Sequence, residues 1–216
     1  MAFLPILLLM LLWSCATPPS SPIIKAEEKM IDAGSKEGLF WPLPPEKPRI
    51  KFLYAFRDTK DLKFPISIFQ RAKRIIYGEK DLRMIRPYSV AVDVDLIVVA
   101  DPGARALHYF DMNKNMYRRF TKAGDALLHT PIGVAMGANK IYISDSARGK
   151  VYGIDYKGRR LFAIKDVERP TGLAFEKKNS WLYVADTLGF RIRVYDQSGK
   201  RLFAFGKRGI GTGEFN

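Results

Sequence analysis

The chain has 216 residues, of which 47% are hydrophobic, so it can bury a proper core and general disorder is excluded. Its formal net charge is +14, from 36 Lys and Arg against 22 Asp and Glu. A charge of this sign favours anionic partners, because it creates a field that attracts them.

The first 14 residues, "MAFLPILLLMLLWS", predict a signal peptide, because the apolar run is too short for a comfortable membrane span. The following "LLWSC" resembles a bacterial lipobox, which implies that Cys15 carries acyl chains such as palmitate and anchors the protein to the cell envelope. Ala16, rather than Asp, implies a periplasm-facing position on the outer membrane of a Gram-negative cell. The alternative is an ordinary cleaved signal with an incidental cysteine, since Trp13 and the lack of an early Lys or Arg are atypical of a lipobox.

Residues 15–48 contain "TPPSSP" and "WPLPPEKP" and predict a semi-extended tether that follows the lipidated cysteine, because prolines favour the polyproline II conformation. Residues 49–216 form the predicted folded domain. Within it, residues 65–77 place their apolar and basic side chains on opposite faces of a helix. This amphipathic helix either packs on its own domain or lies on phospholipid headgroups.

Three related copies follow and begin at Arg86, Thr130 and Arg169, each with "RP" or "TP" at its start. Each copy has an aspartate at the end of its second apolar run, namely Asp101, Asp145 and Asp186, with spacings of 44 and 41 residues. A second aspartate follows ten residues later in every copy. A repeat of this length predicts a repeat architecture.

Each copy contains four short runs of β-branched, aromatic and aliphatic residues, such as "GLAF", "WLYVAD", "RIRVYD" and "RLFAFG". The turns "DYKG" and "DQSG" suit a type I turn followed by a left-handed glycine, and Asn115 takes that role in the longer "DMNKN". Four strands in a period of roughly 40 to 45 residues are typical of one blade of a β-propeller.

The strings "LYVADTLGFRIRVYDQSGKRLFAFG" and "GTGEFN" resemble the NHL-repeat family of β-propellers, and the sequence from Trp41 onward resembles bacterial lipoproteins of the six-bladed type. The resemblance implies an all-β fold, a β-propeller of NHL type with four-stranded blades, which this sequence represents as an incomplete, truncated six-bladed ring. A closed four-bladed ring is the alternative. Propellers host enzymes and binding modules alike, so the resemblance predicts fold rather than function.

In a propeller, the loops that join strands two and three lie on the same face as the loops that join successive blades. Here those loops carry cations in every copy, which predicts a basic face for an anionic or protein partner: Arg86, Arg105, Arg148, Lys150, Arg169 and Arg191. The alternative is that these cations only solvate the surface or pair with the repeated aspartates. Asp101, Asp145 and Asp186 are expected to accept hydrogen bonds from neighbouring turns and to hold the blade geometry.

No catalytic, cofactor or metal site is predicted, because the only histidines, His108 and His129, do not have metal-ligand spacing. We therefore expect a binding or scaffold module whose partner is a protein, an anionic glycan or a lipid headgroup. The alternative is a propeller enzyme of the lyase or lactonase type, with its metal site in blades missing from this sequence. Nucleic acid is not expected as a partner, because the protein is predicted to be secreted.

Overall fold

The computed structural model describes residues 39–52, 55–56, 61–62 and 83–216. The predicted signal peptide (1–14), Cys15, most of the predicted tether and the predicted helix at 65–77 lie outside these residues. Within the described ranges, no helix has the length and apolar character that crossing a membrane requires.

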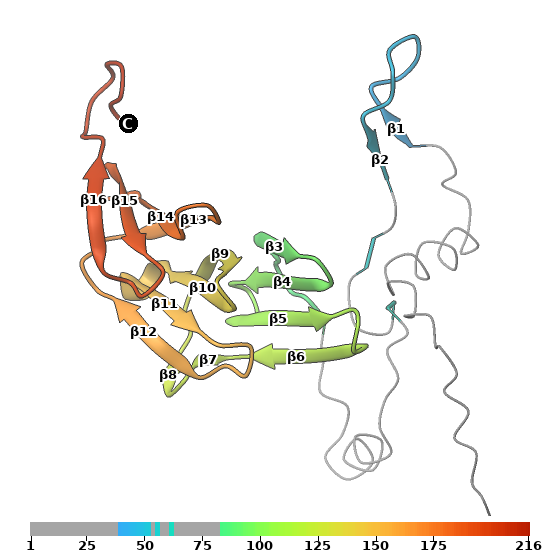
Figure 1. Cartoon of the computed structure of the whole chain (residues 1–216), viewed down its shortest axis with the longest axis horizontal. Helices are drawn as coiled ribbons and strands as arrows, with labels where there is room; N and C mark the ends of the chain where they lie inside the picture. The colour runs from blue at the N-terminus through green and yellow to red at the C-terminus, as the bar shows by residue number, and fades with distance from the viewer. Residues whose placement is uncertain (1–38, 53–54, 57–60, 63–82) are drawn as a thin grey trace, which may run out of the picture.

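Three four-stranded antiparallel sheets make up the folded part, and each sheet is one sequence copy (Figure 1). Blade one contains β3 (Ser89–Asp93), β4 (Leu96–Asp101), β5 (Ala106–Asp111) and β6 (Met116–Phe120). Blade two contains β9 (Pro131–Gly137), β10 (Lys140–Asp145), β11 (Lys150–Ile154) and β12 (Arg160–Ile164). Blade three contains β13 (Pro170–Glu176), β14 (Trp181–Asp186), β15 (Arg191–Asp196) and β16 (Arg201–Phe205).

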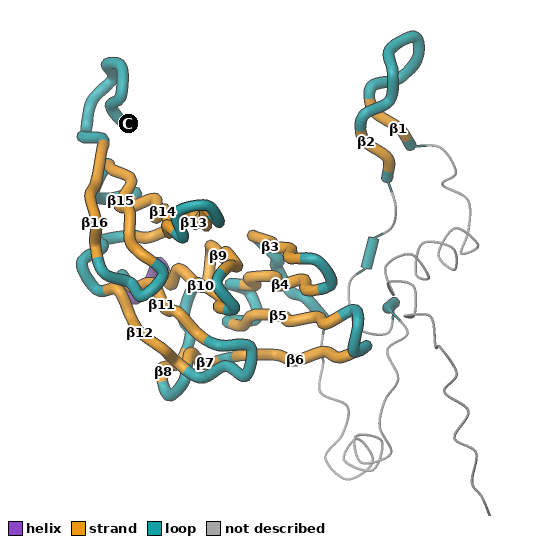
Figure 2. Tube along the Cα trace, viewed as in Figure 1, coloured by secondary structure: helices purple, strands orange, loops and turns teal. Residues whose placement is uncertain are grey.

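In every blade the four strands follow one another in sequence order, as in a meander. The first strands of the three blades lie side by side, with β9 between β3 and β13 (Figures 1 and 2). The predicted all-β fold with four-stranded blades is therefore confirmed.

The turns between strands three and four have the predicted backbone conformation. Gly158 and Gly199 both have φ of 86°, and Asn115 has φ of 48° in the longer turn of blade one. These are left-handed values, which glycine adopts without strain and asparagine tolerates. The strand boundaries of each blade thus follow from local turn chemistry.

Two hydrophobic clusters join the blades. One lies between blades one and two and includes Val98, Leu107 and Ile143, and the other lies between blades two and three and includes Tyr142, Leu182 and Tyr195. Alternate residues of each strand point to opposite faces of the sheet. Blade two therefore contributes to both clusters and is covered on both faces.

Two short hairpins lie outside the blades. Strands β7 (Lys122–Ala123) and β8 (Ala126–Leu127) pair within the connection from blade one to blade two, and Ala123 is fully buried there. Strands β1 (Phe40–Trp41) and β2 (Ile50–Lys51) pair around a proline-rich loop. The boundary predicted between residues 48 and 49 falls between the two strands of this second hairpin. The one helical element described is a single 3-10 turn, η1 (Ser146–Arg148).

Candidate functional site

The three repeated aspartates lie at equivalent ends of β4, β10 and β14, and all are buried. Their carboxylates accept hydrogen bonds from the backbone of the loop that leads into the same blade. Asp101 accepts from the N–H groups of Ile85 and Arg86 at 2.6 and 3.0 Å. Asp145 and Asp186 each accept two such bonds at 2.8 to 3.0 Å. These contacts fasten the loop between blades to the end of strand two.

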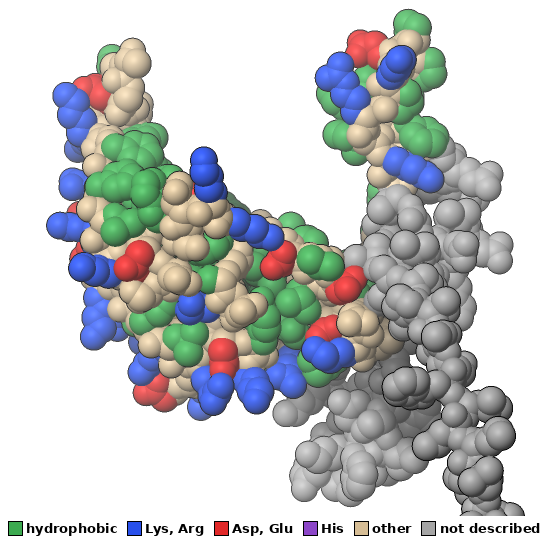
Figure 3. Space-filling view, in the orientation of Figure 1, with side chains coloured by type: hydrophobic (Ala, Val, Ile, Leu, Met, Phe, Trp, Pro, Cys, Tyr) green, Lys and Arg blue, Asp and Glu red, His purple; other side chains and the backbone are tan. Residues whose placement is uncertain are grey.

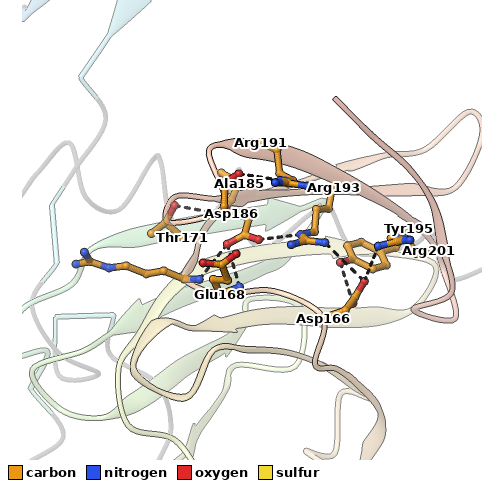
Figure 4. A network of polar contacts seen from close by, with 11 residues as sticks. Asp166, Glu168, Thr171, Ala185, Asp186, Arg191, Arg193, Tyr195 and Arg201 are labelled. Atoms are coloured by element: carbon orange, nitrogen blue, oxygen red, sulfur yellow. Dashed lines mark hydrogen bonds and ion pairs between the residues drawn. The ribbon is translucent and has the colours of Figure 1, made fainter. Parts of the chain in front are cut away.

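In blade three the aspartate also pairs with a cation that the sequence analysis did not single out. The Nε–H group of Arg193 donates to Asp186 at 2.8 Å, and both side chains are largely buried (Figure 4). Burial raises the pKa of Asp186, but the N–H group of Arg169 and the Arg193 side chain outweigh burial, and the pKa lies below its usual range. Asp186 is therefore ionised at neutral pH.

Asp166 extends this network to the outer strands of blade three. Its carboxylate accepts a hydrogen bond from the Tyr195 hydroxyl at 3.1 Å and lies 3.5 Å from Nη1 of Arg201 (Figure 4). The loop between blades two and three is thus held by charged contacts at both ends.

The residue seven positions after the strand-two aspartate differs among the blades: it is His108, Tyr152 or Arg193. His108 is fully buried, its Nδ1 lies 2.8 Å from the Tyr117 hydroxyl, and its Nε2 lies 3.4 Å from Asp101. Burial lowers the pKa of His108, which Asp101 only partly offsets, so this histidine is neutral at pH 7. The sequence signal was this fixed spacing, since the register makes the two positions diagonal neighbours on adjacent strands.

The six cations of the predicted basic face come from the loops that these aspartates fasten, two from each blade. Arg86 and Arg105 flank Asp101, Arg148 and Lys150 follow Asp145, and Arg169 and Arg191 flank Asp186. Five of the six side chains are exposed and Lys150 is half-buried. They lie at the same end of each blade, because the end of strand two and the start of strand three adjoin the incoming loop. Among the described residues none of the six has an ion-pair partner within 4.0 Å.

The turns at the opposite end of the blades are mixed in sign. There Lys177 pairs with Asp93 at 2.8 Å, and Arg159 pairs with Asp155 at 2.6 Å. Lys and Arg side chains also lie along the outer edge of the arc of blades (Figure 3). Positive charge therefore also lies outside the predicted basic face. At the opposite end of the blades, however, some of the cations are neutralised by paired carboxylates.

No cluster of three or more His, Cys, Asp or Glu side chains suited to a metal ion occurs in the described part of the chain. His129 lies in the loop before blade two, where its backbone N–H donates to Asp145 and its side chain is exposed. The predicted site residues thus lie at the same end of each blade, in or beside the loops that the structural carboxylates fasten.

No protein-family model matches the chain, and no curated protein sequence matches it either. Among solved structures, the protein is similar to hydrazine synthase from Kuenenia stuttgartiensis, with 14% identity, a TM-score of 0.48, and coverage of 61% of this chain and 40% of that one. It is also similar to the structure of U3-55K, with 14% identity, a TM-score of 0.50, and coverage of 61% and 41%. The chain thus spans about two fifths of the length of these structures. The three blades and the likeness to the second structure define the fold as a β-propeller.

Proposed function

We propose that this protein is a lipid-anchored, extracytoplasmic β-propeller of the NHL type that acts as a binding or scaffold module for an anionic partner. The observation that carries the proposal is the loop face, defined as the six cations Arg86, Arg105, Arg148, Lys150, Arg169 and Arg191. Equivalent loops present two cations per blade on one face, without an acidic partner among the described residues. Such an arrangement focuses a positive potential on one side of the protein.

The partners that fit this chemistry outside the cytoplasm are acidic glycans, lipid headgroups or acidic protein surfaces. The "LLWSC" segment supports anchorage through acylated Cys15, in the bacterial cell envelope and facing the periplasm from the outer membrane. Several acyl chains hold a protein firmly, because each buried methylene contributes about 0.8 kcal/mol. The loop face would then act close to the membrane surface.

The loop face is tested by reversing four of its charges to Glu, at Arg105, Arg148, Lys150 and Arg191. Binding of the full chain to an acidic polysaccharide and to vesicles of phosphatidylglycerol is measured by sedimentation at several salt concentrations. The wild type should bind and should lose affinity steeply with salt, because ions screen exposed charges over about 8 Å at physiological ionic strength. The quadruple variant should lose most of this binding.

The matched control reverses four cations outside the loop face: Lys140, Lys157, Lys178 and Lys200. It changes the net charge by the same amount and should retain most of the binding. Equal losses in the two variants would show that only net charge matters, and the proposed site would be abandoned. The anchor is tested separately with Cys15→Ser, which should release the protein from the membrane fraction; continued membrane attachment with unchanged gel mobility would contradict acylation.

A further inference from the structure

Two exposed aliphatic side chains lie among the cations of the loop face. Leu188, in the turn between β14 and β15, is 53% exposed, and Ile85, in the loop that leads into blade one, is 69% exposed. Arg86 directly follows Ile85, and Arg191 follows Leu188 by three residues. Each aliphatic side chain therefore has a cation of the loop face close to it in the sequence. We call Ile85 and Leu188 the apolar tips.

The two tips occupy adjoining positions at the end of a blade. The backbone N–H of Ile85 donates to the aspartate of blade one, as those of His129 and Glu168 do in blades two and three. Leu188 corresponds to Gly103 of blade one, since each lies two residues after the repeated aspartate. A Cβ atom on Gly103 would lie 3.0 Å from Cγ2 of Ile85. The incoming loop and the turn after strand two thus present neighbouring side chains on the loop face.

Exposure is a property of these positions in every blade. Blade two packs against a blade on each side, yet its residues at the two positions, His129 and Ala147, are both exposed. Leu188 is exposed although the chain that follows blade three contacts its turn, where the Arg208 guanidinium lies 5.1 Å from the centroid of the Phe190 ring. The exposure of the tips therefore follows from their place in the loops.

The opposite end of the blades combines its side chains differently. Val94, in the turn between β3 and β4, is 80% exposed, but it lies between Asp93 and Asp95. Lys177 neutralises Asp93 through an ion pair at 2.8 Å. At that end an exposed aliphatic side chain is thus flanked by carboxylates. On the loop face the tips are instead accompanied by six cations that have no ion-pair partner within 4.0 Å in the part of the chain that the structure describes.

This combination distinguishes among the partners considered above. An anionic phospholipid surface attracts cations through its phosphates and accepts aliphatic side chains in the layer beneath its headgroups. An acidic glycan offers anionic groups but no apolar layer. Five of the six cations of the loop face are arginines, and a planar guanidinium can bind a phosphate through two hydrogen bonds. The chemistry of the loop face therefore favours a lipid surface.

We propose that the loop face rests on an anionic phospholipid surface, with Ile85 and Leu188 in the headgroup layer. This inference rests on the proposed function, because it names the partner of the same site. Two aliphatic side chains bury little apolar area and salt screens the cations, so the contact is weak and reversible. It orients the propeller on the membrane, while the acylated Cys15 provides the attachment.

The test measures where the loop face lies in the full, anchored chain. Ala147→Cys introduces a thiol at the turn position of blade two that corresponds to Leu188, and both tips are retained. A nitrobenzoxadiazole dye is attached to it, and wild-type chains report any labelling of Cys15, the only cysteine of the sequence. The protein is reconstituted into vesicles of phosphatidylglycerol or of phosphatidylcholine.

On phosphatidylglycerol the dye emission should shift to shorter wavelength and should be quenched by lipids brominated near the headgroup. Both effects should be reversed in about 1 M salt, where charges are screened over about 3 Å. The matched control is Val94→Cys, which carries the dye at the opposite end of the blades and should keep its emission in water. Equal shifts at the two positions, or an equal shift on phosphatidylcholine, would overturn the proposal.

The tips are tested by adding Ile85→Ser and Leu188→Ser to the labelled Ala147→Cys chain. The emission shift on phosphatidylglycerol should decrease, whereas binding to an acidic polysaccharide should not change, because the cations remain. Val94→Ser should alter neither. An undiminished shift in the serine variant would contradict a role for the tips.

The same measurements separate this inference from the proposed function. If the dye at Ala147→Cys remains in water on phosphatidylglycerol while the four charge reversals abolish binding to the polysaccharide, the lipid partner is wrong and the basic site stands. If the wild type binds neither the polysaccharide nor the lipid surface through its loop face, both proposals are contradicted.

Discussion

Blades two and three share an alanine, a tyrosine and a phenylalanine at equivalent positions, namely Ala135, Tyr142 and Phe162 in blade two and Ala174, Tyr183 and Phe203 in blade three, but the two tyrosines lie in different environments. Tyr142 of blade two is fully buried beneath Phe175, whereas the equivalent Tyr183 of blade three is half-buried. Whether such a side chain is buried depends on the neighbouring sheet that lies against its own blade. Equivalent residues of a repeat protein should therefore contribute unequally to stability, since each repeat is stabilised by its contacts with its neighbours.

The largest expected difference is between Tyr142→Ala and Tyr183→Ala. Removal of the buried ring of Tyr142 should lower the free energy of unfolding by about 3–5 kcal/mol, as for other large aromatic side chains in cores. Removal of the Tyr183 ring should cost about 1 kcal/mol, a typical value for a single substitution. Urea denaturation of the two variants and the wild type measures both losses. Equal losses would show that Tyr183 is covered within a single chain in solution.

A second difference concerns the structural aspartates. Asp186→Asn removes the carboxylate that lies 2.8 Å from the buried Arg193, which then keeps only Asp166 at 4.0 Å, and should cost about 3 kcal/mol at pH 7. Asp145→Asn should cost less, about 1.5 kcal/mol, because the hydrogen bonds shown for Asp145 come from backbone N–H groups. Chemical denaturation of the two variants gives the comparison, and a larger loss for Asp145→Asn would contradict it.

The same contacts predict how stability changes with acid. The pKa of Asp186 in the folded protein lies below its unfolded value near 3.9, so its contribution is complete above about pH 4 and is lost as the pH falls below that value. The wild type should therefore lose stability below about pH 4 more steeply than Asp186→Asn does. Identical slopes in the two proteins would show that Asp186 does not contribute to acid unfolding.

A further expected difference is between the equivalent glycines Gly133 and Gly172. Gly133→Ala should cost about 1–3 kcal/mol, because its Cβ would overlap backbone that cannot move without separating the blades. Gly172→Ala should be neutral or should stabilise a monomeric chain by about 0.4–1 kcal/mol, since the unfolded chain loses freedom and nothing obstructs the methyl group. Thermal denaturation of both variants measures this difference; a large loss from Gly172→Ala would contradict the open space beside Gly172.

Much of the fold was predictable from the sequence because its signals are local. The apolar runs that end at Asp101, Asp145 and Asp186 became β4, β10 and β14, and the turns at Gly158 and Gly199 adopt the expected left-handed conformation. The hairpin of β7 and β8 was missed, because each of its strands is only two residues long. Strands of that length leave no alternating pattern to detect.

The candidate site was predictable in part. The spacing of the repeats was sufficient to assign six cations to equivalent loops, since four follow a repeated aspartate by a few residues and two, Arg86 and Arg169, stand at the start of a sequence copy. The pairing of Arg193 with Asp186 and the contact of His108 with Asp101 were not predicted. Both contacts join diagonal neighbours on two adjacent strands, and these partners become evident only once the register is known.

The sequence by itself determined the four-stranded repeat unit, its strand boundaries and which cations lie in equivalent loops, because alternation and turn chemistry act over a few residues. Only the tertiary structure decided which faces of those blades are covered. The strand register aligns Ala174, Tyr183, Val194 and Phe203 in a row across blade three. This row has the same apolar character as its buried counterpart in blade two. Burial is a property of two surfaces in contact, so the sequence of one surface cannot determine it.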